Sequence, residues 1–351
     1  MTSGSPVPAS AQYWPAYYGF IHAHTAYSID YHGDKSDTPA VAFQYARDTA
    51  GLDWMAVSDH AESYIGQASW TATKEAADDY TVDGSFVAFR AFEYSNSMQG
   101  HVCVVNTESW TNWEKDHLIS YFFDWLANYP EAVATFNHPG SYDIFNNEFY
   151  HFNYRSDIAP MMVGLEMLNS GSKFDSRDKG YDGQVSFLDE AIQKGWWLGS
   201  VSGDDAHDRV WGTRDVSRTG VLAEGLTRAD LIDAFRARRF FTSEDSNAYV
   251  SFQMNGAEMG SRLTVHSAPT LNVYFSDPDG EAWTGLKVYK NGVVVAEESF
   301  NDAGAGTADV AVPLPSGTDY YYVRVEQSDG QRIQPAPIWL TRSATATVAA
   351  E

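Results

Sequence analysis

The segment Phe20-Ile-His-Ala-His-Thr-Ala-Tyr-Ser-Ile-Asp30 places two histidines at alternating positions of an expected strand, with an acid six residues after the second. Side chains two residues apart in a strand leave the same face, so His22 and His24 can present both imidazoles to one metal ion. Asp30 can return from the following loop as an oxygen ligand. Taken alone, a His-x-His segment is more often structural, so its interpretation depends on the rest of the chain.

Imidazoles and carboxylates recur where other apolar runs end. The further segments are Val57-Ser-Asp-His60, Phe92-Glu-Tyr94 with Gly100-His101, Phe136-Asn-His-Pro139 and Ser202-Gly-Asp-Asp-Ala-His207. In barrels and open α/β sheets, functional groups gather at the carboxyl ends of strands, so we expect these segments to converge on one rim. Such a donor set suits Zn, Mn or Fe, and it is too large for one tetrahedral ion.

Up to about residue 240, short apolar runs alternate with helical patterns, which is typical of an α/β fold. Helices are predicted from Thr38-Pro39 to Gly51, over 116–129 and 184–194, and after Thr227, where Asp230 completes a capping box. The expected strands are 53–58, 86–92, 102–105, 132–136, 163–168, 198–201 and 220–223. Continuous apolar runs of this kind suit strands that are covered on both faces.

Beyond residue 265 the pattern changes to short strands joined by turn residues. Strands are expected at 271–275, 286–289, 293–296, 308–312 and 320–326, and Lys290-Asn-Gly-Val293 predicts a hairpin. The sequence therefore predicts two domains, an α/β domain over 1–265 and an antiparallel β-sandwich over 266–351.

The chain of 351 residues has a formal net charge of −24, which disfavours binding to nucleic acid or to an anionic membrane. Its single cysteine, Cys103, excludes an internal disulfide framework and a cysteine-rich zinc site. No apolar run is long enough to span a membrane. The first ten residues lack the features of a signal peptide, which predicts a cytoplasmic protein, or a secreted one if a leader has been removed.

The ordered segments His22-x-His24…Asp30, Ser58-Asp59-His60, Glu93, Asn137-His138-Pro139 and Asp205-Ala206-His207 resemble the PHP (polymerase and histidinol phosphatase) superfamily over roughly residues 17–240. Gly100-His101, Ala237-Arg-Arg-Phe-Phe-Thr242 and the C-terminal β-rich region further resemble its carbaryl-hydrolase-type branch. The superfamily resemblance implies a distorted (β/α)7 barrel with two or three divalent metal ions, Zn, Mn or Fe, at its mouth.

The resemblance also implies how the ligands are shared. One ion would bind His22, His24, Glu93 and Asp205, a second would share Glu93 with His101 and His138, and a third would bind Asp30, His60 and His207. Asp204 and Asp205 are both candidates for the ligand that precedes His207, and the spacing favours Asp205.

The function predicted from these features is hydrolysis of small phosphomonoesters or phosphodiesters by a metal-bridging hydroxide. Glu93 would act at the centre, Asp59 would orient a ligand or shuttle a proton, and Arg209 would bind the phosphoryl group or simply form a salt bridge. The alternatives are a carboxylic-ester or carbamate hydrolase that uses the same site, and a non-catalytic, metal-stabilised binding protein. The expected partner is a small-molecule ester, and the oligomeric state is left open.

Overall fold

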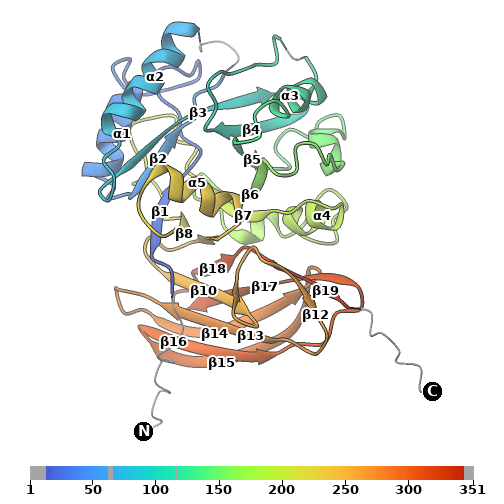
Figure 1. Ribbon diagram of the computed structural model, residues 1–351. Coiled ribbons are helices and arrows are strands. Elements are labelled where there is room, and N and C mark those ends of the chain that lie inside the picture. Colours follow the sequence, from blue (N-terminus) through green and yellow to red (C-terminus); the bar gives the residue numbers. More distant parts are fainter. Residues whose placement is uncertain (1–12, 62–65, 116, 344–351) are drawn as a thin grey trace, which may run out of the picture. The chain divides into compact units, whose positions relative to one another are not determined.

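The computed structural model describes residues 13–61, 66–115 and 117–343, which form two compact units (Figure 1). One unit spans Trp14–Asn247, and the other contains the chain from Ala248 onward. This boundary precedes the one expected after residue 265, because β10 (Tyr249–Met254) pairs along its length with β13 (Thr270–Ser276). Residues 1–10, in which no signal peptide is predicted, lie outside the described residues.

The first unit is built on a sheet with the order β9-β8-β1-β2-β3-β4-β5-β6-β7. Its strands are β1 (Ala16–Phe20), β2 (Trp54–Val57), β3 (Val87–Asn96), β4 (Gly100–Val105), β5 (Val133–Asn137), β6 (Met162–Asn169), β7 (Gly199–Gly203), β8 (Arg218–Leu222) and β9 (Phe240–Ser243). The predicted α/β class is confirmed. The structure does not show a strict β/α alternation, because β3 and β4 form a hairpin and both β4 and β8 run antiparallel to their neighbours.

The two ends of this run of strands come together. The Ser202 N–H of β7 donates a hydrogen bond to Thr219 Oγ1 of β8 (2.9 Å), and the Asp205 N–H donates to the His22 carbonyl beyond β1 (3.0 Å). Strands β1, β2, β3, β5, β6 and β7 all run in the same direction. Their carboxyl ends therefore meet on one side of the curled sheet.

Five α-helices accompany these strands in the described part of the chain: α1 (Pro39–Asp48), α2 (Gln67–Tyr80), α3 (Ile119–Leu126), α4 (Phe187–Gln193) and α5 (Arg228–Arg236). There are also two 3₁₀ turns, η1 (Glu148–Phe152) and η2 (Phe174–Arg177). The helix start predicted at Thr227 is present, since Thr227 Oγ1 accepts the Asp230 N–H (3.1 Å). The second bond of a capping box is replaced, because Asp230 Oδ2 accepts the Thr227 hydroxyl (2.7 Å). Helices α3 and α4 are shorter than predicted, and α2 was not predicted. None of the described helices has the length and apolar character that crossing a bilayer requires.

Strand β2 shows why the apolar runs are continuous. Trp54 and Ala56 belong to a core cluster that includes Phe235 of α5, whereas Met55 belongs to another that includes Phe43 of α1. Both faces of the strand are therefore buried, as the sequence predicts.

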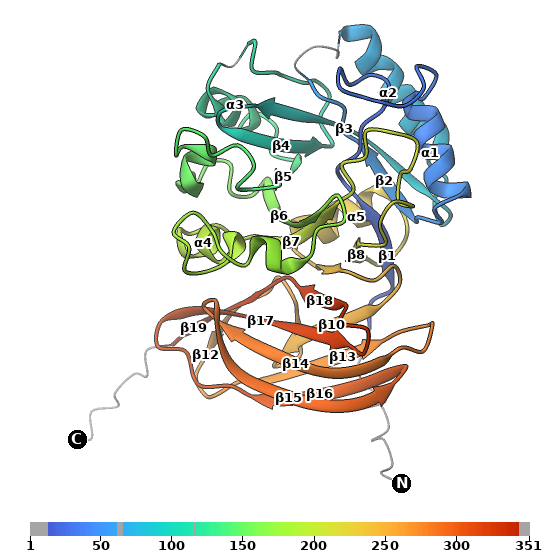
Figure 2. The same ribbon diagram turned by 180° about the vertical axis from the view of Figure 1, so that it is seen from behind.

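The second unit contains two sheets (Figures 1 and 2). One has the order β11-β10-β13-β16, and in the other β17 pairs with β14 on one side and with β18 and β19 on the other. The remaining strands are β11 (Ala257–Glu258), β12 (Arg262–Val265), β14 (Ala282–Lys290), β15 (Val293–Ala303), β16 (Ala305–Ala311), β17 (Thr318–Gln327), β18 (Arg332–Pro335) and β19 (Ile338–Arg342).

Aromatic rings connect the two sheets. Phe275 of β13 stacks on Phe300 of β15, with ring centroids 4.9 Å apart, and lies 5.0 Å from Trp283 of β14. The predicted hairpin is confirmed: β14 and β15 are joined at Asn291-Gly292, where both residues have positive φ (51° and 80°) as a tight hairpin turn requires.

Candidate metal centre

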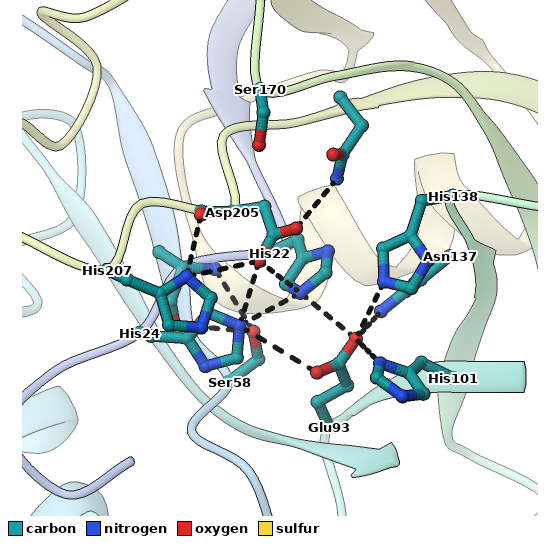
Figure 3. Close-up of polar contacts among 12 residues, drawn as sticks. His22, His24, Ser58, Glu93, His101, Asn137, His138, Ser170, Asp205 and His207 are labelled. Carbon is teal, nitrogen blue, oxygen red and sulfur yellow. Dashed lines mark hydrogen bonds and ion pairs between the residues drawn. The ribbon is translucent and has the colours of Figure 1, made fainter. Parts of the chain in front are cut away.

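The nine residues predicted to bind metal come together on the side where the parallel strands end. They are referred to below as the ligand cluster: His22, His24, Asp30, His60, Glu93, His101, His138, Asp205 and His207. Figure 3 labels all of them except Asp30 and His60. His22 and His24 follow β1, His60 follows β2, and Glu93 lies within β3. These side chains therefore meet where the carboxyl-end rule for α/β sheets places them.

Glu93 lies at the centre of the cluster and is fully buried. Its Oε1 lies 3.1 Å from His22 Nε2, 3.3 Å from His101 Nδ1 and 3.5 Å from His138 Nε2. Its Oε2 lies 2.9 Å from His60 Nδ1. One carboxylate thus faces imidazoles from β1, β2, β4 and β5, which is the position that a ligand shared by two ions must occupy.

Two aspartates complete the cluster. Asp205 Oδ1 lies 3.1 Å from His24 Nε2 and 3.3 Å from His22 Nε2. Asp30 Oδ2 lies 3.2 Å from His60 Nε2 and 3.3 Å from His207 Nε2. The structure thus brings together the third predicted set of Asp30, His60 and His207.

Asp204, the other candidate for the ligand before His207, lies outside the cluster. Its Oδ2 accepts a hydrogen bond from the N–H of Gly212 (3.0 Å), and burial raises the pKa of its carboxyl to about 7. The spacing preference for Asp205 therefore agrees with the geometry.

Hydrogen bonds behind the cluster fix the tautomers of its first two imidazoles. His22 Nδ1 donates to Glu166 Oε1 (2.8 Å). His24 Nδ1 donates to Ser28 Oγ (2.9 Å), whose hydroxyl donates to Asp59 Oδ1 (2.8 Å). In the neutral imidazoles, both Nε2 atoms therefore carry lone pairs directed at the interior of the cluster.

This arrangement fits a bound cation. The Nε2 atoms of His22 and His24 lie 3.1 Å apart, and two lone pairs at that distance repel each other unless a positive charge lies nearby. In the described part of the chain, the buried His101 Nδ1, His138 Nδ1 and His207 Nε2 have no hydrogen-bond partner. Nitrogen and carboxylate donors with these properties suit divalent Zn, Mn or Fe.

The electrostatics of the cluster lead to the same conclusion. Burial, followed by the nearby His60, lowers the pKa of His24 to about 3. Burial opposes a charge on His60, but Glu93 and Asp30 raise its pKa to about 11. Burial likewise opposes ionisation of Glu93, but His22, His101 and His60 hold its pKa well below the usual range. The ionised carboxylates therefore create a field that favours positive charge within the cluster.

The other two residues predicted to act in catalysis lie outside the cluster. Asp59 is buried behind His24 and accepts hydrogen bonds from the Thr25 N–H (2.6 Å) and Oγ1 (2.7 Å), in addition to the one from Ser28. The Arg209 guanidinium pairs with Asp37, with Nε 2.7 Å from Oδ1. Within the described residues, no ion pair joins Arg209 to the cluster.

Glu166, to which the sequence assigns no role, holds two parts of the site. Its Oε1 accepts a hydrogen bond from His22 Nδ1. Its Oε2 accepts hydrogen bonds from the His138 N–H (2.8 Å) and the Asn169 side-chain amide (3.0 Å). The sequence does indicate that this carboxylate is unusual, because Glu166 is the only acid in the apolar run Val163-Gly-Leu-Glu-Met-Leu168. A buried carboxylate there requires donors around it.

Asn137 belongs to the segment Asn137-His138-Pro139, and the sequence assigns it no role of its own. In the structure, its side-chain amide donates a hydrogen bond to Glu93 Oε1 (2.7 Å).

No protein-family model matches this chain. An uncharacterized protein of Chlamydia pneumoniae is 22% identical over 344 residues, covering 88% of this chain and 55% of that protein. The chain thus spans about half the length of this curated relative. A solved two-domain protein from Bacteroides vulgatus, containing a predicted PHP-like metal-dependent phosphoesterase, aligns with 97% of this chain and 99% of its own, with a TM-score of 0.50 and 14% identity. At this identity the likeness shows a shared fold.

Proposed function

We propose that this chain is a metal-dependent hydrolase that cleaves phosphoesters of small alcohols or phenols, on a distorted (β/α)7 barrel of the PHP type. The observation that carries the proposal is the convergence of six imidazoles and two aspartates around the buried carboxylate of Glu93. The fold shared with a protein that contains a predicted PHP-like metal-dependent phosphoesterase supports it.

The ligands divide into three overlapping sets. His22, His24, Glu93 and Asp205 would hold one ion, Glu93 with His101 and His138 a second, and Asp30 with His60 and His207 a third. Divalent ions held there would supply a water ligand of lowered pKa and would stabilise negative charge that develops on the ester oxygens.

The remaining residues of the site would orient the ligands. Glu166 holds the His22 ring, and Ser28 with Asp59 holds the His24 ring, so that both Nε2 atoms stay unprotonated. His22, His24 and Glu93 are fully buried, whereas 48% of the Asp30 side chain is exposed. A small ester would therefore reach the site from the Asp30 side.

A carboxylic-ester or carbamate hydrolase is the second candidate, and one observation favours it. Among the described residues, no Lys or Arg forms an ion pair with a member of the ligand cluster. A phosphoryl group would thus depend on the metal ions alone for charge compensation at these contacts. The negative net charge favours a small ester over nucleic acid in either case.

The test is to measure metal content and turnover in the same protein samples. His22→Ala and Glu93→Ala should each lose bound metal and activity together, whereas His266→Ala in the second unit should keep both. The substrate panel should include 4-nitrophenyl phosphate, bis(4-nitrophenyl) phosphate, 4-nitrophenyl acetate and an aryl N-methylcarbamate. Wild-type activity in H22A would refute the proposal, and bound metal without hydrolysis of any ester would identify a non-catalytic, metal-stabilised protein.

A further inference from the structure

The loop after β5 places an aromatic side chain against the ligand cluster. Tyr142 stacks face to face on the His101 imidazole, with ring centroids 4.2 Å apart and the planes 24° from parallel. The same ring lies 5.5 Å from that of His138. Tyr142 is half-buried, and within the described residues its hydroxyl has no hydrogen-bond partner. A hydrogen-bond donor is thus available at the edge of the proposed metal site.

The hydroxyl of Tyr142 interacts electrostatically with the carboxylates of Glu93, Asp205 and Asp30, all members of the ligand cluster. A phenol has one O–H donor, and its ordinary pKa of about 10 lies well above neutral pH. The group can therefore donate a hydrogen bond to an oxygen that enters the site.

One buried carboxylate holds Tyr142 in this position. Glu148 is fully buried, and its Oε1 accepts the Tyr142 N–H (2.9 Å). Its Oε2 accepts the Gly140 N–H and the Tyr181 hydroxyl, both at 2.6 Å. Three donors on one carboxylate fix the backbone between His138 and Glu148.

The turn that contains Glu148 is itself anchored on the β3–β4 hairpin. Phe149 to Phe152 all have positive φ (47–61°), a conformation that side chains other than glycine rarely adopt. The Phe149 N–H donates to the Gln99 carbonyl (2.9 Å), and the Phe149 ring covers Gly100 so closely that a Cβ atom there would overlap the ring. Since Gly100 precedes His101, the turn and the imidazole that Tyr142 covers rest on the same hairpin.

We propose that Tyr142 is a substrate-orienting residue whose hydroxyl donates a hydrogen bond to a non-bridging oxygen of the ester, and that Glu148 is the positioning residue that fixes it. This inference rests on the proposed hydrolase function and adds to it a donor supplied by the protein. A fixed donor aimed at an oxygen that gains negative charge stabilises the transition state more than the ground state.

The test replaces the hydroxyl and keeps the ring. In the metal-loaded protein, Tyr142→Phe should lower kcat/KM about 100-fold for the best ester of the panel, the size of effect seen when a single oxyanion donor is removed. It should also weaken binding of inorganic phosphate, measured by calorimetry, about tenfold. Metal content should stay at the wild-type level. Tyr154→Phe, on an exposed tyrosine that packs on Trp196, is the matched control and should change neither value.

A double-mutant cycle tests the positioning role. Glu148→Gln should lower kcat/KM in the wild-type background and have little further effect in Y142F, because both changes act through one hydroxyl. Additive losses would overturn the role of Glu148. An unchanged kcat/KM in Y142F beside an active wild type would overturn the role of Tyr142 alone. A metal-loaded wild type that hydrolyses no ester would refute the proposed function and this inference with it.

Discussion

Replacing Glu166 by Gln should weaken metal binding while leaving the size of the side chain unchanged. The Glu166 carboxylate accepts three hydrogen bonds: one at Oε1 from His22 Nδ1, and two at Oε2 from the His138 N–H and the Asn169 amide. Glutamine offers one oxygen and one NH₂ group. If its oxygen faces His22, its NH₂ group meets two other donors.

The alternative orientation fails as well. If the glutamine NH₂ group faces His22, the imidazole has to carry its proton on Nε2, the atom that lies 3.1 Å from Glu93 Oε1. That proton removes a metal ligand. Leaving a buried donor without an acceptor costs about 1–3 kcal/mol, and loss of a partner that orients a ligand typically costs 10–100-fold in metal affinity. We therefore expect a 10–100-fold weaker Kd, equal to about 1.4–2.8 kcal/mol.

The assay is calorimetric titration of chelator-treated protein with Zn²⁺ and Mn²⁺, alongside urea unfolding of the same metal-free samples. Glu131→Gln is the matched control, because Glu131 is exposed and pairs on the surface with Arg236. An unchanged Kd in E166Q, with the fold intact, would show that Glu166 does not set the His22 tautomer. The geometric case for a cation at His22 and His24 would then fail.

Three further outcomes are expected. Burial raises the pKa of Asp204 to about 7, so the folded state holds a proton that the unfolded chain releases above about pH 4. The free energy of unfolding should therefore decrease as the pH rises from about 4 toward 7. Asp204→Asn should remove this decrease, which is at most about 4 kcal/mol, in urea unfolding measured at several pH values. Arg209→Ala should change kcat less than about threefold, because the Arg209 guanidinium is already paired with the Asp37 carboxylate. A loss of about 100-fold would instead support the catalytic role predicted for Arg209. Gly100→Ala should destabilise the fold by about 1–3 kcal/mol in thermal unfolding, because the φ of Gly100 is 96° and the new Cβ would overlap the Phe149 ring. An unchanged Tm would show that the turn containing Phe149 moves away freely.

The location of the site could be predicted from the sequence because chemistry and periodicity coincide there. His22, His60 and His138 each follow an apolar run, and the carboxyl ends of parallel strands share one edge of the sheet. The N-cap of α5 at Thr227 and the Asn291-Gly292 hairpin were also predictable, since both depend only on neighbouring residues.

What the sequence could not provide depends on contacts between distant segments. Strand direction is one case: β4 and β8 run antiparallel, yet their apolar runs look like those of the parallel strands. Tyr142 is another, because its proposed role depends on Glu148 and on the His101 ring rather than on its neighbours in the sequence. Helix α2 was missed because the side chains it buries are mostly small or polar, apart from Trp70.

The separation of the cluster residues along the chain constrains when the proposed ions could enter. The segment after β7 closes on β1 through the Trp211 indole N–H, which donates to the His24 carbonyl across 187 residues (2.8 Å). A nascent chain that has not yet reached this segment lacks Asp205 and His207, so full loading of the proposed ions would have to follow the emergence of this segment from the ribosome. Once that unit has closed, Glu93 is inaccessible and Asp30 remains at the surface. Ions beside Asp30 should therefore exchange with chelators much faster than those between His22 and Glu93, giving metal loss in two kinetic phases.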